Sequence, residues 1–95
     1  MIKHVVMWRL KNGSEDRADE LIDMLNALPP LIPEIKELSV GKNVKEGEFA
    51  ADVALVTAFD SLDTLEDYAV HPDHVKVGAF LKDIVAERRV VDFEF

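Results

Sequence analysis

Residues 2–10 read IKHVVMWRL, and the alternating residues of this stretch form two faces that together indicate the fold. Its side chains alternate with the two-residue period of a β-strand. One face carries Ile2, His4, Val6, Trp8 and Leu10, and the other carries Lys3, Val5, Met7 and Arg9. Because Val5 and Met7 make the second face partly apolar as well, we expect a strand that is covered on both faces.

The elements that follow are predicted from similar patterns. Ser14 is expected to cap an amphipathic helix that ends at Pro29–Pro30. The other expected elements are a strand over 35–44 with a bulge at Gly41, a strand over 51–59, a helix from 60 or 61 to about 70, a helix from Pro72 to about 86, and a strand over 88–95. This β-α-β-β-α-α-β order predicts an α+β, ferredoxin-like protomer with a four-stranded antiparallel sheet.

Composition narrows the classes of partner. The chain has 95 residues, which suits a single domain over 1–95, and its formal net charge is −8. Such an acidic surface disfavours nucleic acid and anionic membranes. The sequence contains no cysteine, and no apolar run is long enough to cross a bilayer. We therefore expect a cytoplasmic protein that binds neither nucleic acid nor membranes.

The second face of the sheet predicts self-association. The helices are expected to cover only the face that carries His4 and Trp8. The other face would expose Val5 and Met7, together with the alternating residues Val91, Phe93 and Phe95 of the last strand. An apolar surface of this size marks an interface. The sequence therefore predicts a homodimer that forms through the sheet face.

Three segments together resemble a known family. They are IKHVVMWRLK at 2–11, DTLEDYAVHPDHVKVG at 63–78 and VVDFEF at 90–95. They are similar to the stress-responsive dimeric α/β barrel (Dabb) family, and the similarity extends over essentially the whole chain. This resemblance implies a ferredoxin-like protomer whose sheet packs on that of a second copy to form a dimeric α/β barrel.

The resemblance also implies candidate site residues. Many members of the family have no known activity, some plant relatives are heat-stable stress proteins, and one branch is a polyketide cyclase. In that branch the second histidine of His-Pro-x-His acts as the base and the preceding tyrosine assists. These roles correspond to His74 and Tyr68, and the histidine of the first strand and the aspartate of the last correspond to His4 and Asp92.

The expected topology offers a separate route to the same cluster. We expect the first and third strands to run parallel, side by side, so that the helix after residue 60 begins near Leu10. His74 then lies about 19 Å back along the helices, and His4 lies about 20 Å back along the first strand. Asp92 pairs with the beginning of that strand. A carboxylate that orients a histidine suits acid/base chemistry. The alternative, which structural networks with buried histidines favour, is that His4 and Asp92 form a cross-strand pair and His74 caps local backbone.

The neighbouring residues have simpler interpretations. His71 precedes Pro72 and is expected to cap the helix that starts there. A metal site at His71, Asp73 and His74 is disfavoured, because helical ligands usually lie four residues apart. We expect Trp8 to belong to the core and Arg88–Arg89 to form a solvated strand end.

The sequence therefore favours a small, partly apolar pocket bordered by His4, Tyr68, His74 and Asp92. It would bind a small apolar or aromatic carbonyl compound, or perform acid/base chemistry on one like that of a cyclase or isomerase, without cofactor or metal. Two alternatives remain. One is a non-enzymatic stress-response dimer whose pocket is filled by side chains, and the other is a monooxygenase of the related dimeric barrel superfamily.

Overall fold

The computed structural model describes all residues, 1–95, and has the predicted order of elements. The four strands form one sheet in the order β2-β3-β1-β4. The strands are β1 (Ile2–Leu10), β2 (Glu37–Lys42), β3 (Val53–Phe59) and β4 (Val85–Glu94), and the helices are α1 (Ala18–Asn26), α2 (Leu62–Val70) and α3 (Pro72–Ile84). The antiparallel, ferredoxin-like sheet predicted from the sequence is confirmed.

The direction of β3 differs from the one expected. β3 lies beside β1, but the two strands are antiparallel, with Ile2 opposite Phe59 and Trp8 opposite Val53. The connections explain this direction. α1 returns the chain so that β2 runs parallel to β1, and the hairpin that follows reverses it into β3. The end of β3 therefore lies beside the beginning of β1, so α2 starts near Ile2 rather than near Leu10.

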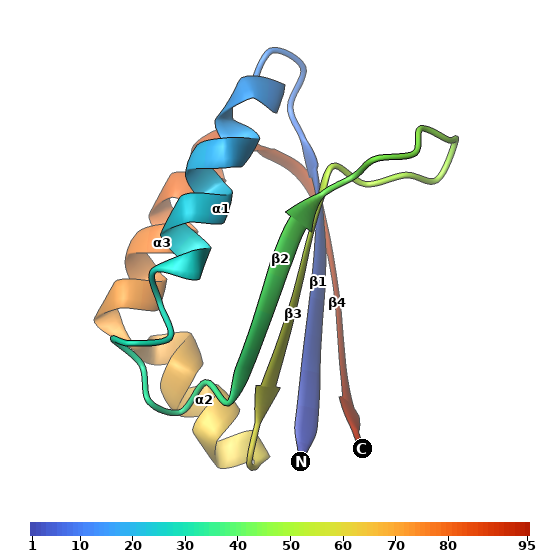
Figure 1. Ribbon diagram of the computed structural model, residues 1–95. Helices are drawn as coiled ribbons and strands as arrows, with labels where there is room; N and C mark the ends of the chain where they lie inside the picture. Colours follow the sequence, from blue (N-terminus) through green and yellow to red (C-terminus); the bar gives the residue numbers. More distant parts are fainter.

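All three helices lie on one face of the sheet (Figure 1). α1 begins through a short 3₁₀ turn, Glu15–Arg17, and Ser14 makes no side-chain capping bond, contrary to expectation. Ser61 caps α2 through reciprocal hydrogen bonds with Thr64. None of the helices combines the length and the apolar character that crossing a bilayer requires.

The joint between α2 and α3 has the predicted geometry. His71 is extended and ends α2, and Pro72 occupies the first turn of α3. The Asp73 backbone N–H donates to Nδ1 of His71 at 3.1 Å, so His71 caps α3 as expected. A proline at this position loses no helical hydrogen bond, because the first N–H groups of a helix have no partner within it. The joint turns the chain so that α3 runs back over the sheet toward β4 (Figure 1).

The start of the last strand and the position of the irregularity in the sheet differ from the predictions. α3 ends at Ile84 and β4 begins at once with Val85, three residues earlier than predicted. Pairing between β2 and β3 continues regularly through Gly41, so the predicted bulge is wrong. The irregularity lies instead between Arg9 and Leu10, where β1 pairs with β4.

The core fills the space between the helices and the sheet. Trp8 is almost fully buried there, as predicted. The buried cluster that contains Trp8 draws on β1, β3 and all three helices and includes Val6, Leu21, Leu25, Leu55, Phe59, Tyr68, Val77 and Ile84. The helices cover this core on one face of the sheet, and they leave the other face of the sheet uncovered.

The uncovered face of the sheet is apolar, as the sequence predicts. Met7 is 43% exposed, Val91 54%, Phe93 47% and Phe95 56%, whereas Val5 is partly buried beside its strand neighbours. Val5 of β1 lies directly between Val56 of β3 and Val91 of β4, so the apolar side chains of the three strands are contiguous. We refer to Val5, Met7, Val91, Phe93 and Phe95 as the open face.

Candidate active site

A cavity of about 310 Å³ lies between the helices and the sheet. Eight of its thirteen lining residues are apolar, and the walls are built by Val6, Leu25, Leu55, Val77, Leu81 and Val85. Polar groups enter it from four elements, namely His4 and Trp8 from β1, Tyr68 from α2, His74 and Lys82 from α3, and Arg88 from β4. A mostly apolar space with a few polar groups is typical of a small-molecule site.

His74 stands in the first turn of α3, with its side chain half-buried. Its Nδ1 lies 3.0 Å from the carbonyl oxygen of Ala69. Because a carbonyl only accepts hydrogen bonds, Nδ1 carries the hydrogen of the neutral ring and Nε2 keeps its lone pair. Burial lowers the pKa of His74 below 6.5, and the nearby charges of His4, Arg88 and His71 lower it further, against the bond to Ala69. His74 is therefore a neutral base at pH 7.

Tyr68 packs directly against His74. The centroids of the two rings are 4.2 Å apart, and Tyr68 is 1% exposed. Burial raises the pKa of Tyr68 to about 12, and the charge of Arg88 only partly offsets it. The hydroxyl consequently stays protonated at neutral pH and can donate a hydrogen bond.

Two buried donors beside the cavity have no partner. They are the Tyr68 hydroxyl and the indole N–H of Trp8. Leaving such groups unpaired costs about 1–3 kcal/mol each, and buried polar groups in proteins rarely lack partners. Both atoms are closed off from solvent, so a ligand acceptor reaches them only if neighbouring groups move. A ligand that carries an oxygen acceptor would relieve this cost.

His4 and Asp92 form the predicted cross-strand pair. They lie directly opposite each other in the β1–β4 register, and Nδ1 of His4 is hydrogen-bonded to the Asp92 carboxylate. The ring of His4 is edge-on to Tyr68, with centroids 6.2 Å apart. Asp92 itself does not line the cavity. It therefore acts on the cavity only by fixing the ring of His4.

The four predicted site residues thus form a chain of contacts from Asp92 through His4 and Tyr68 to His74. The parallel-strand argument that placed His74 over His4 is wrong, because β3 is antiparallel to β1. The two histidines nevertheless line the same cavity. The α2–α3 joint contributes to this arrangement, because it sets Tyr68, whose ring lies near both histidine rings, and His74 on either side of the break at Pro72.

No group of three or more histidine, cysteine, aspartate or glutamate side chains is arranged to hold a metal ion. His71 is engaged as a helix cap, as described above. Its Nδ1 accepts the Asp73 N–H, so this atom offers no free lone pair to a ligand.

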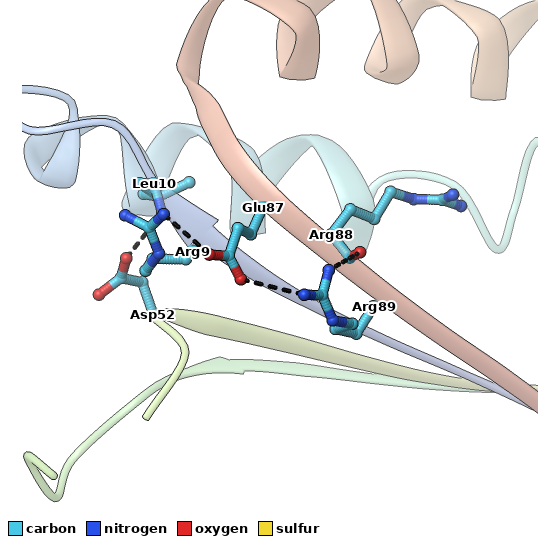
Figure 2. Close-up of polar contacts among 6 residues, drawn as sticks. All are labelled: Arg9, Leu10, Asp52, Glu87, Arg88 and Arg89. Carbon is cyan, nitrogen blue, oxygen red and sulfur yellow. Dashed lines mark hydrogen bonds and ion pairs between the residues drawn. The ribbon is translucent and has the colours of Figure 1, made fainter. Parts of the chain in front are cut away.

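Two cationic residues at the cavity were missed by the sequence analysis, namely Lys82 and Arg88. Arg88 and Arg89 are both exposed to solvent, as expected, but they point to opposite sides of β4. Figure 2 shows the Arg88 side chain directed toward the helices, whereas Arg89 lies on the other side with Glu87 and Arg9. The alternation of side chains along the strand could have predicted this, because Arg88 lies on the same face of β4 as Asp92 and pairs with Trp8.

Comparison with known proteins places the chain in a family. The model of the stress responsive A/B barrel domain matches residues 2–95. Since this match spans nearly every residue, the chain belongs to that family. The resemblance seen in its three sequence segments is thereby confirmed.

Three relatives indicate how far the similarity extends. Protein SCO4036 of Streptomyces coelicolor, which is uncharacterized, is 30% identical over 98 residues, and the match covers all of both chains. Olivetolic acid cyclase of Cannabis sativa is 26% identical over 95 residues, covering 97% of this chain and 94% of the cyclase. A solved structure from Bacteroides fragilis, described as a dimeric protein of unknown function with a ferredoxin-like fold, has a TM-score of 0.91 at 33% identity. That match covers 99% of this chain and 95% of the solved one.

Proposed function

We propose that the protein is a homodimer whose cavities bind a small apolar carbonyl compound and catalyse cofactor-free proton transfer beside its carbonyl group. The observation that carries this proposal is the contact of His74 with Tyr68 in an apolar cavity. One group is a neutral base and the other a protonated donor, and carbonyl chemistry needs both. A relative named as a cyclase, of nearly the same length, supports the assignment.

The proposed reaction begins with Nε2 of His74 taking a proton from the carbon next to the carbonyl. The electrons of the broken C–H bond form the enolate, whose negative charge rests on oxygen. The Tyr68 hydroxyl donates a hydrogen bond to that oxygen, which stabilises the charge where it develops. The His74 imidazolium then returns a proton to carbon. No electron leaves the substrate, so no redox cofactor takes part.

In this proposal His4 and Asp92 are positioning residues. The Asp92 carboxylate accepts the hydrogen on Nδ1 of His4 and so fixes the tautomer and orientation of the ring. The ring in turn packs edge-on to Tyr68 and limits how far the phenol can move. We expect substitutions at Asp92 to act through His4 and Tyr68 rather than by touching the substrate.

The homodimer is proposed to form through the open face. Burying its apolar side chains against the same surface of a second copy is worth about 25 cal/mol per Å² before the costs of association. The dimeric description of the Bacteroides fragilis structure supports this arrangement. The helices lie on the opposite face of the sheet (Figure 1), and the cavity lies between them and the sheet, so each protomer keeps its own site.

Deuterium exchange tests the proposed chemistry. Cyclohexyl methyl ketone in D₂O at pH 7.5 loses its methyl proton signal in NMR as protons beside the carbonyl exchange. We expect the protein to accelerate this loss, and His74→Asn to lower the acceleration by about 100-fold, the usual contribution of a general base. His71→Asn is the matched control, because asparagine also caps a helix and His71 lies outside the cavity.

Two outcomes would contradict the proposal. Exchange that is unaffected by His74→Asn would remove His74 as the base. Ketone that neither binds nor exchanges would favour the alternative of a non-enzymatic dimer.

A further inference from the structure

The cations of this protein are mostly neutralised by neighbours. Seven of the eleven lysine and arginine side chains lie within ion-pair distance of a carboxylate. The four without such a partner are Lys11, Lys45, Lys82 and Arg88. Two of these four, Lys82 and Arg88, line the cavity. In a chain whose net charge is −8, unpaired positive charge is thus gathered at the one apolar cavity that holds the proposed catalytic pair.

Arg88 forms no ion pair with the neighbouring carboxylate of Glu87. On the other side of β4, Glu87 lies 3.1 Å from Arg9 and 3.4 Å from Arg89, and Arg89 also donates to the backbone oxygen of Arg88 (Figure 2). The guanidinium of Arg88 takes no part in this cluster and is directed toward the helix layer. Its charge reaches the site, because it opposes the rise in the pKa of Tyr68 that burial causes and adds to the lowering of the pKa of His74.

Resting on the function proposed above, we propose that the natural ligand of this cavity is an apolar carboxylic acid, bound as its carboxylate by Arg88, with Lys82 as a second cation in the cavity lining. Its apolar body would lie against the Leu25, Leu55 and Val77 walls, and its ketone oxygen would face Tyr68. A guanidinium presents two parallel N–H donors that match the two oxygens of a carboxylate. Two cations without a glycine-rich phosphate loop suit a singly charged group better than a phosphate.

This assignment also explains why the donors around the cavity lack partners. The Trp8 indole N–H and the Tyr68 hydroxyl are buried donors without a partner, and the Arg88 guanidinium, which is exposed to solvent, also lines the cavity and can donate. A keto acid supplies several oxygen acceptors at once. The opposite class of ligand, an amine or other cation, would meet two like charges at the cavity and no carboxylate, since Asp92 bonds His4 outside the lining.

The test compares two probes of one shape, cyclohexanecarboxylate and cyclohexanecarboxamide, at pH 7.5 and low salt. The chain has a single tryptophan, so the indole N–H of Trp8 gives one NMR resonance that reports occupation of the cavity. We expect the carboxylate to bind roughly tenfold more tightly than the amide, as for a hydrogen bond to a charged group. This preference should shrink as salt is added.

Arg88→Gln should abolish the preference, because the affinity for the carboxylate falls to about that for the amide. Lys11→Gln is the matched control, because it removes one of the other unpaired cations, away from the cavity, and should keep the preference. Melting curves of both variants check that the exposed substitutions leave the fold intact. A wild-type protein that binds both probes equally, or an Arg88→Gln variant that still prefers the carboxylate, would overturn the inference.

The outcome is distinguishable from that of the proposed function. If cyclohexyl methyl ketone undergoes His74-dependent exchange but the carboxylate is not preferred, the function stands and the anionic ligand is wrong. If the preference is present and depends on Arg88 but no exchange occurs, the ligand class stands and the acid/base chemistry is wrong.

Discussion

Val91→Asp is expected to break the dimer. Val91 lies on β4, opposite Val5 of β1, and is 54% exposed in the single chain. Burying a whole valine side chain is worth about 1.5–3 kcal/mol. The exposed half therefore contributes about 1 kcal/mol per protomer when a second copy covers it. A two-fold interface uses the same residue twice, so the lost apolar contact alone amounts to about 2 kcal/mol per dimer.

The introduced carboxylates add a larger effect. Each protomer would place one unpaired charge in an apolar interface, and the effective penalty is several kcal/mol per buried ion. With the lost apolar contact we expect the dimer to be weakened by at least about 5 kcal/mol. This corresponds to a rise in the dimer dissociation constant of roughly three orders of magnitude or more.

Sedimentation velocity at several protein concentrations measures the effect. Val75→Asp is the matched control, because Val75 is 55% exposed, nearly the same as Val91, but belongs to α3 on the opposite side of the sheet. We expect wild type and Val75→Asp to sediment as dimers and Val91→Asp as a monomer. A Val91→Asp protein that stays dimeric at micromolar concentration would refute the assignment of the open face as the interface.

Three further predictions concern the site. Tyr68→Phe should lower the rate of ketone exchange about tenfold or more, because it removes the donor to the enolate. Calorimetry should find the free energy of unfolding unchanged or higher, because the deleted hydroxyl is buried and unpaired. A strongly destabilised variant would contradict this. The exchange rate should rise with pH through a pKa below 6.5, where His74 loses its proton, and level off by pH 7, because Tyr68 keeps its proton until about pH 12. An exchange rate that falls as the pH is raised through this range would exclude His74 as the base. Chelator treatment should leave the melting temperature unchanged, and a loss of stability that zinc restores would reverse our view of the His71–His74 segment.

Local patterns were sufficient to predict the elements. Alternation in 2–10 and in the last strand reports burial on each face, and the Pro72 break marks the helix joint whatever the rest of the chain does. Boundaries were less accurate where a tertiary contact decides them. α3 stops at Ile84 because the chain passes there directly into β4, and the backbone oxygen of Ile84 accepts the N–H of Lys11. No local pattern in 82–88 encodes that contact.

The candidate site was predicted in part. Tyr68 and His74 lie six residues apart across one joint, so their proximity is nearly local. The pairing of His4 with Asp92 required the register of β1 and β4, and alternation together with the antiparallel order supplied it. That Arg88 lines the cavity was not predicted, because two adjacent arginines are typical of a solvated strand end. The two arginines are told apart only by counting the alternation of side chains along the strand from Asp92, which puts Arg88 on the same face as Asp92 and Arg89 on the other.

The most direct test of the account is a crystal structure of the protein soaked with cyclohexyl methyl ketone. We predict that the ketone occupies the cavity with its oxygen in hydrogen-bond range of the Tyr68 hydroxyl. Its methyl carbon should lie about 3–3.5 Å from Nε2 of His74, the separation of reacting atoms in a near-attack arrangement. A ketone bound elsewhere, or a cavity closed by the side chains of His74 and Tyr68, would contradict the central claim that these two residues form an acid/base site.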